Sequence, residues 1–85
     1  MIKCLLLKDD LVLVTEIEEV GSDVGEPDCK LTNPYKIKKN IDGDYEILDW
    51  IDFSDQKEIM IHSHNILTIV DPSENILKLY NEIVK

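Results

Sequence analysis

Apolar residues recur at every second position along much of this 85-residue chain, a spacing typical of β-strands with one buried face. Residues 2–8 and 11–20 are the first two segments of this kind, and Lys8-Asp9-Asp10 forms the tight turn between them. A loop is expected at residues 21–28, where two glycines, a proline and two aspartates cluster. Further strands are predicted at residues 29–41, 57–62 and 66–70, with a hairpin insert that includes residues 45–53.

The segment that begins at Cys29 alternates most regularly. The pattern predicts an apolar face made of Cys29, Leu31, Tyr35, Ile37 and Ile41, and a polar face made of Lys30, Thr32, Lys36, Lys38 and Asn40. Pro34 cannot donate a ladder hydrogen bond, so the strand is expected to have a free edge or a bulge at this position. The dipeptide Asp42-Gly43 favours a hairpin turn directly afterwards.

Residues 45–53 are apolar on both predicted faces. Ile47, Ile51 and Phe53 fall on one face, and Leu48 and Trp50 fall on the other. Such a segment is expected to be central in the fold or covered by another subunit. Trp50 and Phe53 offer surfaces for stacking on bases, but burial in a core or an interface is the favoured explanation.

The C-terminal segment, residues 71–85, has the signals of a helix. Asp71 suits the N-cap, Pro72 the first helical position, and Glu74 completes a pattern like a capping box. One apolar stripe is expected, formed by Ile76, Leu77, Tyr80, Ile83 and Val84. The sequence therefore predicts one domain, residues 1–85, with a strongly bent five-stranded antiparallel sheet or barrel over 1–70 and a helix over 71–85.

Charge narrows the range of partners. The net charge is −9, with 18 acidic residues and nine lysines, and the chain contains neither arginine nor alanine. Arginine is the best bidentate ligand for phosphate, so a wide surface that binds nucleic acid without regard to sequence is not expected. Residues 30–39 contain four lysines and no acid, which predicts one local basic strip. The bias toward Ile, Lys, Asn and Asp suggests an A/T-rich coding genome, such as that of a bacteriophage or a low-GC bacterium.

The two cysteines point to a reducing compartment. Cys4 and Cys29 each lie within an apolar run and are not spaced as metal ligands or as a disulfide framework, so both are expected to be packed, reduced thiols. No apolar segment approaches the length of a membrane span, and the leucine run at residues 5–7 is too short for a signal peptide. A cytoplasmic protein without a membrane partner is predicted.

The tetrapeptide His62-Ser63-His64-Asn65 is a polar break between two β-branched apolar runs. Three interpretations remain open: a solvated turn, a loop that touches nucleic acid, or a metal site in which an acid such as Asp71 joins the two histidines. No cofactor is implied. Ser63 does not lie in a nucleophile-elbow pattern, and the sequence has no glycine-rich loop that could bind phosphate. We therefore expect that the protein is not an enzyme.

The segment Ile61-His62-Ser63-His64-Asn65-Ile66-Leu67-Thr68-Ile69 resembles the second sequence motif of Sm and Sm-like RNA-binding proteins. In that family an apolar residue precedes Arg-Gly, a polar residue, Asn and an apolar strand; His62 and Ser63 replace the Arg-Gly pair here. "LLLKDDLVLVTEIEEV" and Asp28-Cys29-Lys30-Leu31-Thr32-Asn33 match the first motif loosely. The chain is also similar to small Sm-like proteins of cyanophage and marine-metagenome origin.

The resemblance implies a homo-oligomeric ring, from pentamer to heptamer, in which strands of neighbouring subunits pair. It also implies binding of single-stranded RNA, or of DNA, in nucleic-acid processing. The site residues it implies are Lys30, Asn33, His62, Ser63, His64 and Asn65. The alternative is an acidic structural or protein-interaction module of a phage that binds no nucleic acid.

Overall fold

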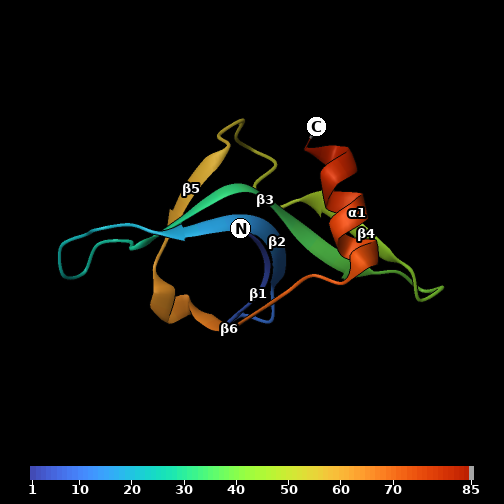
Figure 1. The fold of residues 1–85 in the computed structure, drawn as a ribbon, viewed down its shortest axis with the longest axis horizontal. Coiled ribbons are helices and arrows are strands. Elements are labelled where there is room, and N and C mark those ends of the chain that lie inside the picture. The colour runs from blue at the N-terminus through green and yellow to red at the C-terminus, as the bar shows by residue number, and fades with distance from the viewer. Residues whose placement is uncertain (85) are drawn as a thin grey trace.

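The computed structural model describes residues 1–84 and contains one antiparallel sheet and one α-helix (Figure 1). The strands are β1 (Ile2–Leu7), β2 (Val12–Glu19), β3 (Cys29–Lys39), β4 (Tyr45–Asp49), β5 (Glu58–Ile61) and β6 (Ile66–Val70), and the helix is α1 (Glu74–Ile83). The predicted class, mainly β with a C-terminal helix, is confirmed. Lys85, the last residue of the predicted helix, lies outside the described residues.

The sheet is curled but not closed. Its strands follow the order β4-β3-β2-β1-β6, and β5 also pairs with β3. The eleven-residue β3 carries β4 opposite Tyr35–Lys39 and β5 opposite Cys29–Thr32, so β4 and β5 lie end to end along one edge. The hairpin insert thus supplies a sixth strand. At the other end of the sheet β6 pairs with β1, and only a short turn connects it to β5 (Figure 1).

A bulge in β3 corrects the predicted alternation of faces. Val14 lies opposite Tyr35, whereas Glu16 lies opposite Thr32, so Asn33 and Pro34 together face the single residue Thr15. One extra residue moves every later side chain of the strand to the other face. Pro34 therefore marks a bulge, as the sequence allowed.

The lysines of β3 consequently do not form one strip. Lys36 lies opposite Leu13, on the concave face of the sheet, whereas Lys30 lies opposite Glu18, on the face that α1 partly covers. The predicted alignment of Lys30, Lys36 and Lys38 is wrong, because the bulge at Asn33–Pro34 separates the first from the other two.

The bulge also divides the apolar residues between two cores. On the concave face, the buried side chains are Leu5, Leu7, Leu13 and Leu31, with Trp50, Ile61 and Ile66 packed against them. On the opposite face, α1 packs on the sheet through Cys4, Val14, Ile76 and Tyr80, with Tyr35 and Ile37 at the margin. Cys4 and Cys29 are both free and buried, as predicted.

The helix begins later than predicted. Its N-cap is Ser73, whose hydroxyl accepts a hydrogen bond from the Ile76 amide at 3.3 Å. Asp71 instead forms an ion pair with Lys3 of β1. Ser and Asp are both good N-caps; in the structure Ser73 caps the helix and the Asp71 carboxylate pairs with Lys3. Among residues 1–84, no helix has the length and apolar character required to span a membrane.

The segment 45–53 is a strand only as far as Asp49, after which the chain bends into a loop. The predicted face of Ile47, Ile51 and Phe53 does not form, since Phe53 in this loop is 87% exposed. The Asp42-Gly43 hairpin is confirmed. Gly43 has a φ of +89°, and the side chain of Asn40 accepts hydrogen bonds from the amides of Asp42 and Asp44.

Candidate nucleic-acid interface

The polar break between β5 and β6 forms a single 3₁₀ turn at Ser63–Asn65. The Asn65 amide donates to the His62 carbonyl at 3.1 Å, which closes the turn. The Asn65 carbonyl accepts from the Lys8 amide at 2.9 Å, which ties the turn to the β1–β2 connection. The backbone of Asn65 therefore secures the turn, and its exposed side chain is not needed for that purpose.

The two histidine rings lie together on this turn. Their centroids are 4.8 Å apart and their planes are inclined by 40°. His62 is partly buried and His64 is exposed, so the His64 ring packs at the surface against the less exposed His62 ring. Aromatic rings in this arrangement offer a platform on which an unstacked base can lie.

Asp28 joins the end of the β2–β3 loop to the same turn. Its carboxylate accepts two hydrogen bonds from Ser63, one from the amide and one from the hydroxyl, each at 2.7 Å. These bonds favour the charged carboxylate, and they hold the pKa of Asp28 below its ordinary value. The two segments that resemble the Sm motifs, one beginning at Asp28 and the other containing His62–Asn65, therefore meet in the structure.

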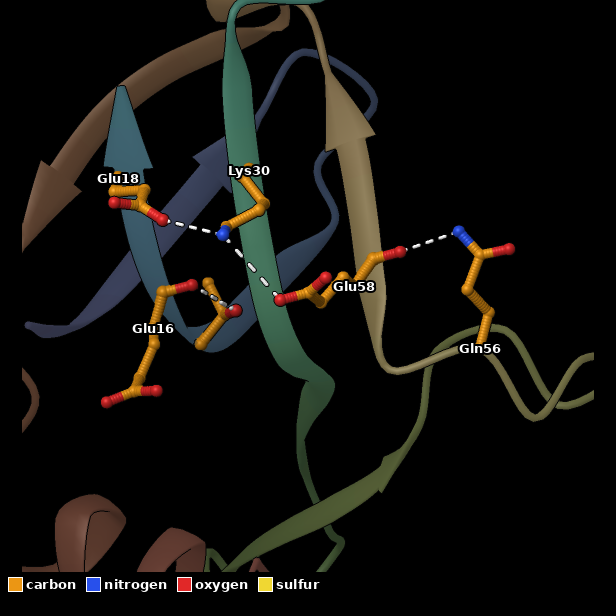
Figure 2. Close-up of polar contacts among 6 residues, drawn as sticks. Glu16, Glu18, Lys30, Gln56 and Glu58 are labelled. Atoms are coloured by element: carbon orange, nitrogen blue, oxygen red, sulfur yellow. Dashed lines mark hydrogen bonds and ion pairs between the residues drawn. The ribbon is translucent and has the colours of Figure 1, made fainter. Parts of the chain in front are cut away.

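Lys30 lies nearby on β3, but its charge is compensated. Its ammonium is 2.7 Å from a carboxylate oxygen of Glu18 and 3.6 Å from one of Glu58 (Figure 2). The bond with Glu18 raises the pKa of Lys30 and lowers the pKa of Glu18. A phosphate would have to compete with two carboxylates for this ammonium, so Lys30 is poorly placed as a phosphate ligand.

Asn33 lies away from the turn. It forms part of the β3 bulge, with a φ of +53°, and its amide donates to the Lys57 carbonyl at 2.8 Å. Cys29 pairs with Ile61 at the turn end of β5, so Asn33 is four residues, or about 13 Å of strand, farther along. The structure gives Asn33 a role in shaping β3 and does not bring it to the histidines.

Lys8 is a site residue that the sequence patterns did not single out. Its amide bonds to Asn65, and its side chain lines a hollow together with Trp50 and Asn65. Only the pairing of β1 with β6 brings the Lys8 turn beside the histidine turn, and no local sequence signal reports this pairing.

The metal interpretation gains no support from the arrangement of side chains. Among residues 1–84, no three His, Cys, Asp or Glu residues are grouped closely enough to hold a metal ion. Asp71, considered as a third ligand, is paired with Lys3.

No curated protein matches the sequence at a significant level. A protein-family comparison matches residues 1–85 in full, under the description "Family of unknown function (DUF6561)". A match over the whole chain establishes membership. The chain therefore belongs to the DUF6561 family.

Proposed function

We propose that the protein assembles edge to edge into a closed homo-oligomer and presents its histidine turns to single-stranded RNA or DNA. One observation carries the proposal: the two strands that flank the histidine turn, β5 and β6, are edge strands that each pair on one side only among residues 1–84. An unpaired edge offers a row of backbone donors and acceptors to a second chain.

The side chains of these edge strands support pairing with another copy. Leu67, Ile69 and Val70 of β6 are each about half exposed, at 56%, 49% and 53%. Met60 of β5 is 43% exposed. Apolar residues in a row on an edge strand are unfavourable in water unless another protein surface covers them. A chain of this size also has a small core of its own, and a partner subunit would enlarge it.

Pairing of β5 in one copy with β6 in the next is a head-to-tail contact, which produces either a ring or an open filament. A strongly curled subunit favours the ring, and closure removes every free copy of these two edges. The Sm resemblance implies a ring of about five to seven copies. Each histidine site would bind weakly, but several sites repeated around such a ring would bind one nucleic-acid strand together, and this multivalency would raise the overall affinity.

The charge distribution favours contact with bases over contact with phosphates. Lys30 is already paired with two carboxylates, and the chain has a net charge of −9 and no arginine. The histidine pair, in contrast, presents flat aromatic surface. We therefore propose binding by stacking, with weak dependence on salt, in the cytoplasm, where the free thiols of Cys4 and Cys29 stay reduced.

The same charge observations favour a second candidate, an acidic protein-interaction module. In this case the β6 edge or α1 recruits a different protein, and nucleic acid has no part in the function. Affinity capture with and without nuclease separates the candidates: a nuclease-resistant protein partner without bound RNA supports the module.

The assembly is tested by placing charges on the free edge. The double variant Leu67→Lys with Val70→Lys should dissociate the oligomer to single chains, measured by native mass spectrometry. The matched control is Val24→Lys with Ile41→Lys, which changes two fully exposed loop residues and should leave the mass unchanged. A wild-type protein that is a single folded chain at micromolar concentration would refute the assembly.

Nucleic-acid binding is tested by fluorescence polarisation with labelled oligo(U) and oligo(A) at low salt. His62→Ala with His64→Ala should abolish binding without changing the mass of the assembly. Binding that is absent in the wild type, or unchanged in the histidine variant, would refute the proposed role of the turn.

A further inference from the structure

A hollow of about 310 Å³ opens beside the histidine turn, between the β1–β2 turn and the loop after β4. Its lining is Leu7, Lys8, Asp9, Trp50, Ile61 and Asn65. The volume is at the lower end of the range for small-molecule sites, and it suits a single planar ring system.

The floor of this hollow is apolar, and its side chains are held in place by packing on the core. Leu7 is buried in the concave core, and Trp50 and Ile61 pack against the same core while remaining partly accessible. Trp50 is therefore held by packing on the core and still reaches the hollow. A fixed indole of this kind is a stacking surface that loses little conformational freedom when a ligand binds.

Three polar side chains around this apolar floor make no hydrogen bond or ion pair among residues 1–84. In this part of the chain, no side-chain hydrogen bond engages the indole N–H of Trp50 or the side-chain amide of Asn65, and no ion pair engages the Lys8 ammonium. The Lys8 amide donates to the Asn65 carbonyl at 2.9 Å, so the main chain that carries these two side chains is anchored at the rim. Apolar walls with a few anchored polar groups are the usual composition of a ligand site.

The chemistry of these groups indicates the ligand class. The Lys8 ammonium donates, and the Asn65 amide both donates and accepts, which matches the ring nitrogens and carbonyl oxygens of a nucleobase stacked on the indole face. Lys8 is the one cation in the lining, and Asp9 is beside it with its carboxylate 3.4 Å from the Leu11 amide. The local charge therefore does not favour a polyanion, and recognition must come mainly from the base.

We propose that this hollow binds one nucleobase of a single strand, stacked on Trp50 and hydrogen-bonded by Asn65, with Lys8 contacting the adjoining phosphate. The inference depends on the proposed nucleic-acid role and adds to it a second base site, separate from the histidine rings. It assigns Trp50, Asn65 and Lys8 to ligand contact.

Trp50 is the only tryptophan in the chain, so its fluorescence reports directly on the hollow. The wild-type oligomer is titrated with uridine 5′-monophosphate and, separately, with ribose 5-phosphate, which lacks the base. The nucleotide should quench Trp50 in a saturable manner, and the sugar phosphate should not. Lys8→Gln should weaken nucleotide binding by about twofold to fivefold, as expected for loss of an exposed ionic contact. Lys78→Gln, which removes an exposed charge on α1, is the matched control and should leave it unchanged.

The outcomes separate this inference from the proposed function. Absence of saturable quenching by the nucleotide, equal quenching by ribose 5-phosphate, or equal weakening by Lys78→Gln would overturn the hollow as a base site. If oligo(U) binding nevertheless requires the two histidines, the proposed function is retained and only the base site in the hollow is rejected. If quenching persists in the His62→Ala with His64→Ala variant, the hollow is a base site independent of the histidine turn.

Discussion

Tyr80 joins the helix to the bulge that divides the two cores, and its hydroxyl is the group to test first. The residue is 1% exposed. Its hydroxyl lies 2.9 Å from the Asn33 carbonyl and 3.2 Å from the Thr32 carbonyl, and the ring meets Tyr35 edge-on with centroids 6.1 Å apart. We predict that Tyr80→Phe destabilises the fold, because it removes the hydroxyl through which α1 hydrogen-bonds to the bulge.

The size of the change in the free energy of unfolding depends on which carbonyl loses its hydrogen-bond donor. Thr32 keeps a second donor, the Thr15 hydroxyl at 3.1 Å, whereas the Asn33 carbonyl loses the shorter of the two Tyr80 hydrogen bonds, at 2.9 Å. Leaving one buried acceptor unsatisfied costs about 1–3 kcal/mol. Because the phenyl ring of the variant still fills the site, no cavity contribution is added. The expected loss in the free energy of unfolding is about 1–2 kcal/mol at pH 7.

Urea denaturation followed by circular dichroism measures this loss, at one fixed protein concentration because the proposed assembly would make the apparent stability depend on concentration. Tyr45→Phe is the control: Tyr45 is 42% exposed, and its substitution should change the free energy by less than about 0.5 kcal/mol. Equal effects of the two variants would refute the role of the Tyr80 hydroxyl in holding the bulge.

The pH dependence gives an independent check. Burial raises the pKa of Tyr80 to about 12, compared with about 10 in an unfolded chain. The folded state thus favours the neutral phenol; its stabilising contribution is complete below pH 10 and is lost as the pH rises from about 10 to about 12. Tyr80→Phe should lose less stability than the wild type over this interval.

Three further predictions concern the turn, the thiols and the ion pair. The bonds from Ser63 lower the pKa of Asp28, so its contribution is present above about pH 4 and lost as the pH falls below that value; Asp28→Asn should flatten this part of the acid unfolding curve recorded by circular dichroism. Burial raises the pKa of the Cys4 and Cys29 thiols, and both should react with a thiol reagent at least about tenfold more slowly in the folded protein than in urea. Lys30→Gln should change oligonucleotide affinity by less than about twofold, since the lysine is already paired; a larger loss in polarisation would show that it binds phosphate.

Alternation and turn residues predicted much of the fold, because both are local. The Asp42-Gly43 turn and strands β1, β2 and β6 agree with their expected positions within one or two residues. The consequence of the bulge was not predictable in the same way. Pro34 indicated a bulge or an edge, but only the pairing with β2 reveals that two residues face Thr15 and that the faces exchange.

Competition between distant groups explains the other differences. Asp71 and Ser73 are both suitable N-caps, and the sequence cannot show that Lys3, 68 residues from Asp71, pairs with Asp71. The contact between Asp28 and Ser63 spans 35 residues. The turn residues could be proposed from the local polar break, whereas the groups that hold the turn come from other parts of the chain.

These distant contacts affect how the candidate site can work. The histidine turn is fixed by Asp28 at Ser63 and by the Lys8 amide at Asn65, so little ordering remains to be done when a ligand arrives. The turn is also short, and the edge strands β5 and β6, each paired on one side only, lie directly before and after it. Pairing of those strands between copies would therefore bring the rigid turns of neighbouring subunits into a regular series. With Lys30 held by its own carboxylates, such a series would recognise flat, uncharged rings better than a chain of phosphates.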